Sequence, residues 1–161
     1  MSNIDKRISE LGLVLPKIFP VPEAMSDFMM MVRIDGERCF VSGHAPLNPD
    51  GSIAQPLGKV GTDLTLEQGI AAAQATALAM LATLKHELGS LDRIKQWNRI
   101  FGMVNSAPGF NQQTPVINGF SKIISDVFGC EIGAHARSAV GMAELPFSIP
   151  VEVEAELSLL T

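Results

Sequence analysis

A chain of 161 residues with a net charge of −5 has room for one folded domain, and its acidic balance argues against a nucleic-acid partner. Nearly half of the residues are hydrophobic and 18% are charged, which predicts a packed core rather than a disordered chain. No apolar run reaches the roughly 20 residues of a membrane span, and the N-terminus lacks the apolar stretch of a secretory signal, so we expect a cytoplasmic protein with no membrane partner.

The few cysteines and histidines favour neither a disulfide nor a metal site. Cys39 and Cys130 have no metal-binding spacing, and none of the three histidines forms an HxxxH pattern. We therefore expect reduced thiols and no bound metal.

The first third of the chain predicts a short helix and then a hairpin. Residues 5–11 are helical in pattern, with Ser2 or Asn3 as the cap. "FMMMVRIDGERCFVSG" reads as two strands joined by a turn at Asp35-Gly36, and we assign the apolar cluster Met29–Met31 to the core.

The rest alternates helices and strands. Residues 66–88 form an apolar helical stripe with a capping box at Thr65 and Gln68 and a stop at Gly89. "IKQWNRIFGMVNS" reads as a strand in which Trp97 and Phe101 share a face, and a second helix runs from near Thr114 to before Gly129. Two strands close the chain, "RSAVGMAEL" and "VEVEAELSL". The order predicts an α+β fold with helices on one face of a mixed sheet.

The last strand has the most regular alternation. Its apolar face carries Val151, Val153, Ala155 and Leu157, and glutamates 152, 154 and 156 lie on the other face. A solvated sheet face would explain this pattern. Arg137, however, heads a run of small and apolar residues on a strand that we expect beside the last one, and a buried cation needs a partner, either protein or ligand. Arg137 and Glu152 facing one another could form a pocket for a carboxylate.

Four segments, taken together, resemble the reactive intermediate deaminase family (the RidA/YjgF group). They are "FVSGHAPLNPDG", the helix that begins at "VGTDLTLEQG", "TPVINGFSKIISDVFG" and "HARSAVGMAELPFSIPVEVEAELSL". The resemblance covers residues 27–160, so residues 1–26 form an N-terminal extension and residues 1–161 a single domain. It implies a chorismate-mutase-like fold, a homotrimer with sites between subunits, no cofactor, and hydrolysis of 2-imino acids to 2-oxo acids and ammonia.

The resemblance also implies roles for individual residues. Arg137 would hold the carboxylate and Glu152 would position the hydrolytic water. The substrate-binding positions would be Gly43, His44, Asn118, His135, Ser138 and Ala139. His135 is open to two interpretations, a surface loop residue or a proton shuttle at the pocket rim. The chain departs from the archetypal deaminases in having no tyrosine and an apolar Ala139 after "ARS", which is typical of a divergent branch.

Two other functions stay open beside the deaminase. A non-catalytic trimer that binds a small carboxylate or a protein partner would use Arg137 but would not need Glu152 as a base. An endoribonuclease, a label given to part of the family, ranks last because the sequence has no basic groove and no acid–base histidine pair.

Overall fold

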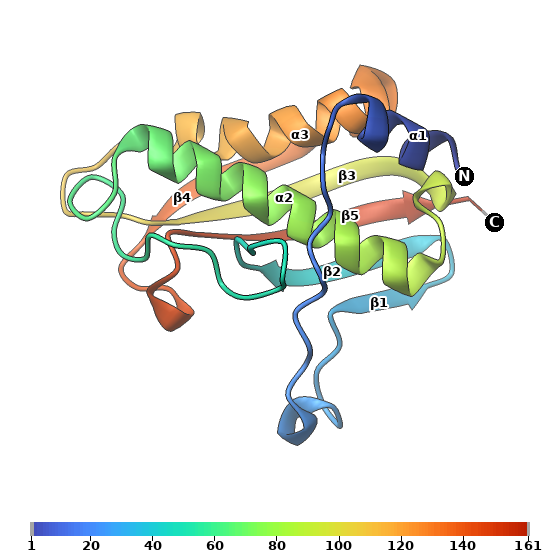
Figure 1. The fold of residues 1–161 in the computed structure, drawn as a ribbon, viewed down its shortest axis with the longest axis horizontal. Coiled ribbons are helices and arrows are strands. Elements are labelled where there is room, and N and C mark those ends of the chain that lie inside the picture. Colours follow the sequence, from blue (N-terminus) through green and yellow to red (C-terminus); the bar gives the residue numbers. More distant parts are fainter. Residues whose placement is uncertain (1, 161) are drawn as a thin grey trace.

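The computed structural model describes residues 2–160, which form a mixed sheet covered by helices (Figure 1). The helices are α1 (Asn3–Glu10), α2 (Leu66–Leu88) and α3 (Gln113–Gly133), with short 3-10 turns η1 (Glu23–Met25), η2 (Leu91–Arg93) and η3 (Pro146–Ser148). The strands are β1 (Val32–Asp35), β2 (Arg38–His44), β3 (Ile94–Asn105), β4 (Ala136–Met142) and β5 (Val151–Leu159). The predicted succession of elements is confirmed.

The sheet has the strand order β1-β2-β5-β3-β4. β3 and β4 are parallel, whereas β1–β2, β2–β5 and β5–β3 are antiparallel. We expected the strand of Arg137 to lie beside the strand of Glu152, and this is wrong because β3 lies between them. A parallel pair needs a long crossover, and α3 supplies it between β3 and β4.

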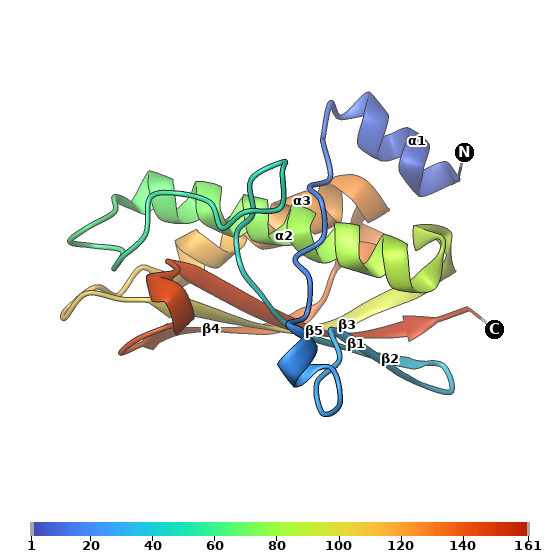
Figure 2. The same cartoon turned by 60° about the horizontal axis from the view of Figure 1, so that its bottom comes forward.

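Both long helices cover one face of the sheet, and α1 packs on the same side (Figure 2). The chain after α1 runs past α2 and places η1 beyond the edge of the sheet that ends in β1 (Figure 1). The predicted α+β arrangement with its helices on one face is therefore confirmed. One face of the sheet is buried under helices, and the other stays open over most of its area.

Local sequence explains the ends of the helices. Thr65 and Gln68 form the predicted capping box of α2, and Gly89 ends the helix in the left-handed conformation with φ 74°. Pro115 lies in the first turn of α3, where a missing N–H costs nothing. Gly129 interrupts α3 with φ 73°, as predicted, but a further short helical turn follows to Gly133.

The hairpin differs from expectation in two details. Asp35 pairs with Arg38, so the turn residues are Gly36 and Glu37, with Gly36 at φ 60°. We expected Met29–Met31 in the core, and this is wrong. Met30 is exposed, and Met29 and Met31 are only partly buried and line a surface cavity.

An irregularity in β3 separates two aromatic residues that the sequence placed on one face. The register to β5 shifts between Trp97 and Arg99, so Trp97 pairs with the buried Leu157 while Phe101 pairs with Glu154. Trp97 is fully buried under the helices, with its ring against Phe120 of α3. The shift turns Phe101 to the open face.

The two long helices and the sheet share one core, to which the N-terminal helix contributes Ile8. Both cysteines are free thiols, with Cys39 buried and Cys130 exposed. Among residues 2–160 no helix has the length and hydrophobicity that crossing a membrane requires.

The close approach of α2 and α3 provides a test of this packing. A Cβ atom at Gly119 of α3 would lie 2.5 Å from the carbonyl oxygen of Ile70 on α2. Gly119→Ala should therefore destabilise the fold by roughly 1–3 kcal/mol, although alanine is the better helix former. Urea unfolding measures this loss. Lys122→Ala on the exposed side of α3 is the control and should stay within about 0.5 kcal/mol of the wild type. A Gly119→Ala protein more stable than the wild type would contradict the packing.

Candidate functional site

A first polar cluster lies where the edge strand β4 meets α3. The Nη1 atom of Arg137 donates a hydrogen bond of 2.9 Å to the Ser121 hydroxyl, and its Nη2 atom donates to the Asn118 amide oxygen. Asn118 and Ser121 are three residues apart, so they lie on the same side of α3. The helix holds the guanidinium plane at two points.

His135 extends this cluster through Ser121. Its Nδ1 atom lies 2.6 Å from the carbonyl oxygen of Gly133, so this nitrogen carries the proton, and its Nε2 atom lies 2.9 Å from the Ser121 hydroxyl. Burial, partly offset by the bond to Gly133, lowers the pKa of His135, and the charge of Arg137 lowers it further. A neutral His135 therefore accepts a hydrogen bond from the Ser121 hydroxyl, which leaves the hydroxyl lone pairs directed toward Arg137.

No carboxylate of the described residues neutralises Arg137. The ion pairs within residues 2–160 do not include this side chain, and its two hydrogen-bond acceptors are uncharged. The partly buried guanidinium keeps donors free for a ligand or a second chain.

A second polar cluster contains Glu152 at the start of β5. Two of the three alternating glutamates of β5 have arginine partners on neighbouring strands, Glu154 with Arg99 at 3.9 Å and Glu156 with Arg38 at 3.6 Å. Glu152 has no such partner in the described chain. Its carboxyl is half-buried, and burial, helped by the charge of Glu154, raises its pKa.

Gly43 of β2 lies directly against this carboxylate. A Cβ atom at Gly43 would overlap the Oε1 atom of Glu152, so a larger residue would displace the carboxylate. Predicted positions Gly43 and Glu152 thus come together in the structure, and the reason for a glycine at position 43 is steric.

His44 is held inside the fold. Its ring is buried, with Nδ1 2.7 Å from the carbonyl oxygen of Ser42 and Nε2 2.9 Å from the Thr83 hydroxyl of α2. Burial lowers the pKa of His44 to about 4, with the bond to Ser42 acting in the opposite direction. His44 lines the cavity next to Glu152, but both ring nitrogens are already engaged.

The two clusters cannot meet within one chain. Arg137 pairs with Ile100 on β3 and points toward α3, whereas Glu152 pairs with Met103 and belongs to the open face. Strand geometry puts their Cα atoms roughly 14 Å apart, and their side chains lie on opposite faces of the sheet.

The remaining predicted positions divide between the faces. Ala139 lies two residues beyond Arg137 on the helix side and packs against the core, so it offers no polar group to a ligand. Ser138 pairs with Phe101 and is exposed on the open face, away from the Arg137 side chain. The structure thus groups Asn118, His135 and Ala139 with Arg137, groups Gly43 and His44 with Glu152, and leaves Ser138 apart.

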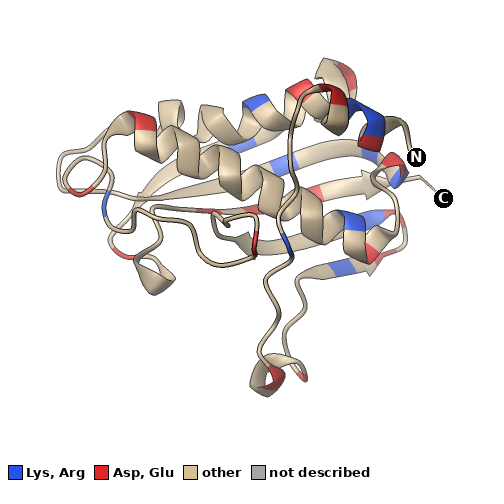
Figure 3. Cartoon of the chain, in the orientation of Figure 1, with Lys and Arg blue, Asp and Glu red and all other residues tan. Residues whose placement is uncertain are grey.

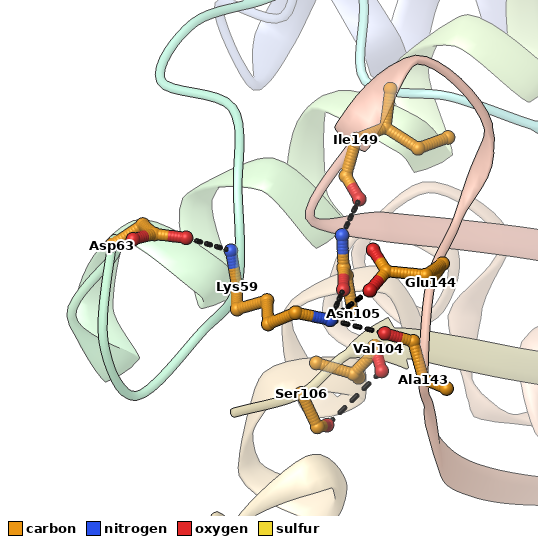
Figure 4. Close-up of polar contacts among 8 residues, drawn as sticks. All are labelled: Lys59, Asp63, Val104, Asn105, Ser106, Ala143, Glu144 and Ile149. Carbon is orange, nitrogen blue, oxygen red and sulfur yellow. Dashed lines mark hydrogen bonds and ion pairs between the residues drawn. The ribbon is translucent and has the colours of Figure 1, made fainter. Parts of the chain in front are cut away.

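A third polar cluster, around Lys59, has a structural role (Figure 4). The Lys59 ammonium donates to the Asn105 side chain at 3.1 Å and to the carbonyl oxygen of Ala143, and it pairs with Glu144 at 3.1 Å. Asn105, which is buried, in turn donates to the carbonyl oxygen of Ile149. These bonds fasten residues 143–149 to the end of β3. Pro146, Phe147 and Ile149 of this segment line the cavity beside Glu152.

Residues 2–160 contain no group of three or more His, Cys, Asp and Glu side chains arranged to hold a metal ion. The first two clusters together offer the guanidinium of Arg137, the half-buried carboxylate of Glu152 and the hydrogen-bonding groups around them.

Sequence reasoning missed Ser121 and the methionines that line the cavity. Ser121 could have been found from its three-residue spacing to Asn118, which predicts a shared helix face. The methionines Met25, Met29 and Met31 carry no such signal, because an apolar side chain suits a core and a cavity wall equally.

The burial of His44 predicts a specific loss of stability in acid. The unfolded chain takes up a proton near the ordinary histidine pKa of 6.5, but folded His44 does so only near pH 4, so acid favours unfolding between these values. This histidine should cost up to about 3 kcal/mol of unfolding free energy on going from pH 7 to pH 4. His44→Gln should remove that part of the pH dependence, as measured by urea unfolding at several pH values. The exposed His86→Gln is the control and should keep the wild-type profile. Parallel pH profiles for the wild type and His44→Gln would contradict the assignment.

Comparison with known proteins agrees with this fold. The sequence model of the family described as "YjgF/chorismate_mutase-like, putative endoribonuclease" matches residues 5–153. Protein TCP17 of Trypanosoma cruzi is 44% identical over 157 residues, which cover 98% of this chain and 94% of TCP17. The crystal structure of Atu1372 from Agrobacterium tumefaciens, a protein of unknown function, has a TM-score of 0.86 and 38% identity, covering 98% of this chain and 92% of that one.

A second solved structure, named as a putative endoribonuclease from Shewanella oneidensis, has a TM-score of 0.89 and 26% identity, and covers 98% of this chain and all of its own. The family match spans most of the chain, the relatives align over nearly its whole length, and the α+β sheet with helices on one face agrees with both. The chain belongs to the YjgF/chorismate mutase-like family, the RidA/YjgF group.

Proposed function

We propose that this protein is an enamine and imine deaminase that hydrolyses 2-imino acids to 2-oxo acids and ammonia at sites formed between subunits of a homotrimer. One observation carries the proposal: Arg137 and Glu152 both lack a counter-ion in the described chain, yet they lie on opposite faces of the sheet. A second copy can bring the Arg137 side of one subunit to the Glu152 side of its neighbour, as closed oligomers allow.

The ligand that suits such a pair carries one anionic and one cationic group. Arg137, fixed by Asn118 and Ser121, would bind the carboxylate of a 2-imino acid through paired hydrogen bonds. Glu152 would face the protonated imine nitrogen and a water molecule. The two charges that the isolated chain leaves uncompensated would then be neutralised by the ligand.

The reaction follows from these positions. Glu152 takes a proton from water as the oxygen bonds to the imine carbon, and it passes that proton to the nitrogen. As the carbon–nitrogen bond breaks, Glu152 takes the proton of the new hydroxyl and passes it to the departing ammonia. Water and iminium thus give a 2-oxo acid and an ammonium ion. Burial raises the pKa of Glu152, which makes its carboxylate a stronger base than an exposed one. Holding water and substrate in place supplies much of the remaining acceleration.

Ribonuclease activity, which the description of the family suggests, has less support. Lys and Arg are interspersed with Asp and Glu over the strands and helices rather than gathered in a stripe (Figure 3). With a net charge of −5, the chain lacks the excess of positive charge typical of proteins that bind phosphate backbones. We also place the activity in the cytoplasm, which suits two free thiols.

A carboxylate-binding role for Arg137 is testable by conservative substitution. Arg137→Lys keeps the charge but cannot reproduce the paired hydrogen bonds of the guanidinium, so we expect 2-oxobutanoate to bind about tenfold or more weakly. Isothermal titration calorimetry measures the affinity. Arg99→Lys, on the open face beside Glu154, is the matched control and should bind as the wild type does. Equal affinity of Arg137→Lys and the wild type would rule out this role.

Substitution of Glu152 separates an enzyme from a binding protein. Glu152→Gln keeps size and hydrogen bonding but removes the base, so turnover of freshly generated 2-aminoacrylate should fall by about 10²–10⁴-fold while 2-oxobutanoate binding persists. Pyruvate release measures turnover, and Glu154→Gln is the control.

Two results of this experiment would change the account. Wild-type protein that binds 2-oxo acids but turns over none of several 2-imino acids would favour the non-catalytic binder, which the apolar Ala139 also suits. A Glu152→Gln protein as active as the wild type would leave the deaminase standing and remove Glu152 as its base.

A further inference from the structure

The cavity beside Glu152 has a volume of about 290 Å³. It lies where β2 ends and β5 begins. Phe19, Met25, Met29 and Met31 line one side, and Pro146, Phe147 and Ile149 line another. Ser42 holds the backbone of residues 30 and 31. Its N–H donates to the carbonyl oxygen of Met31 at 2.9 Å, and its hydroxyl donates to the carbonyl oxygen of Met30 at 2.7 Å.

The lining is almost wholly apolar. Apart from His44 and Glu152, every described residue at the cavity surface is glycine or has an apolar side chain. The ring nitrogens of His44 already bond to Ser42 and Thr83. Glu152 is therefore the one ionisable lining group in the described chain that is free to meet a ligand, and it lies next to Gly43.

The volume of the cavity exceeds what the methyl group of a small 2-imino acid would fill. A protein cavity of about 150 Å³ lined by aliphatic and aromatic side chains takes up benzene. The present cavity is nearly twice as large. A ligand as small as an iminopropanoate would leave most of this apolar surface unfilled, whereas a ring or a branched alkyl chain would cover it.

From this geometry we propose that the protein selects 2-imino acids with a large apolar side chain, aromatic or branched aliphatic, which occupies the cavity beside Glu152. The inference rests on the proposed function, in which the imine nitrogen faces Glu152 and the carboxylate meets Arg137 of a neighbouring subunit. Three unbranched methionine side chains in the lining can adapt to rings and branched chains alike.

The first test compares two ligands that share the 2-oxo acid group. Phenylpyruvate should bind at least about tenfold more tightly than pyruvate in calorimetry, a difference of about 1.4 kcal/mol, because only its phenyl ring can fill the cavity. Methionine methyl groups labelled with ¹³C report where the ring binds. Ring currents should shift the methyl signals of Met25, Met29 and Met31, and leave those of exposed Met30 and core residue Met80 in place.

A matched pair of substitutions links affinity to the cavity. Met29→Trp should fill the cavity and abolish the preference for phenylpyruvate while pyruvate binding persists. Met30→Trp adds the same side chain one residue later, outside the cavity, where the wild-type residue is 56% exposed, and it should keep the preference.

The outcomes separate this inference from the proposed function. Equal affinities for the two oxo acids, or methyl shifts outside the cavity, would overturn the side-chain preference and leave the deaminase intact. A titration with indole, a ring without a carboxylate, covers the case in which neither oxo acid binds. Indole that shifts the three cavity methyls would then retain the ring site and refute the carboxylate chemistry, and unmoved methyls would refute both.

Discussion

The alternation of β5 is the constraint on which the rest of the structure depends. This strand lies between β2 and β3, so its two faces become the two faces of the sheet. Val151, Val153 and Leu157 are buried under the helices, and the glutamates between them must emerge on the other side. A shift by one residue would bury three carboxylates in the core, which the cost of burying charge forbids. The register that builds the core therefore also fixes the position of Glu152.

Charge pairing along β5 distinguishes Glu152 from the other two glutamates of the strand. Arg38 and Arg99 reach Glu156 and Glu154 from the adjacent strands, and their guanidinium groups lie over the rings of Phe40 and Phe101. Exposed pairs of this kind add little stability, but they leave Glu152 as the glutamate of β5 without a cation nearby in the described chain. Glycine at position 43 and the apolar walls beyond it then hold a carboxylate in surroundings that favour its protonated form. Such an arrangement costs stability and is typical of functional sites.

Sequence reasoning predicted the local features well and the long-range ones less so. The capping box at Thr65 and the stop at Gly89 follow from neighbouring residues, and so does the alternation of β5. The place of β4 beyond β3 depends on pairing between distant segments, which no local pattern records. The register shift near Trp97 reversed the expected face of Phe101 for the same reason. No sequence pattern showed that Gly43 lies against Glu152, or that α3 holds Arg137 on the other face of the sheet.

Mixing two inactive variants tests most directly whether each site takes Arg137 from one subunit and Glu152 from another. Arg137→Ala and Glu152→Gln proteins, each inactive alone, would be unfolded together in equal amounts, refolded and assayed for imine hydrolysis. If the residues come from different subunits, random assembly gives about one site in four with both native side chains, and activity should recover to about a quarter of the refolded wild type. If each site draws both residues from one chain, no mixed assembly contains a native site, and a mixture as inactive as its components would contradict the account.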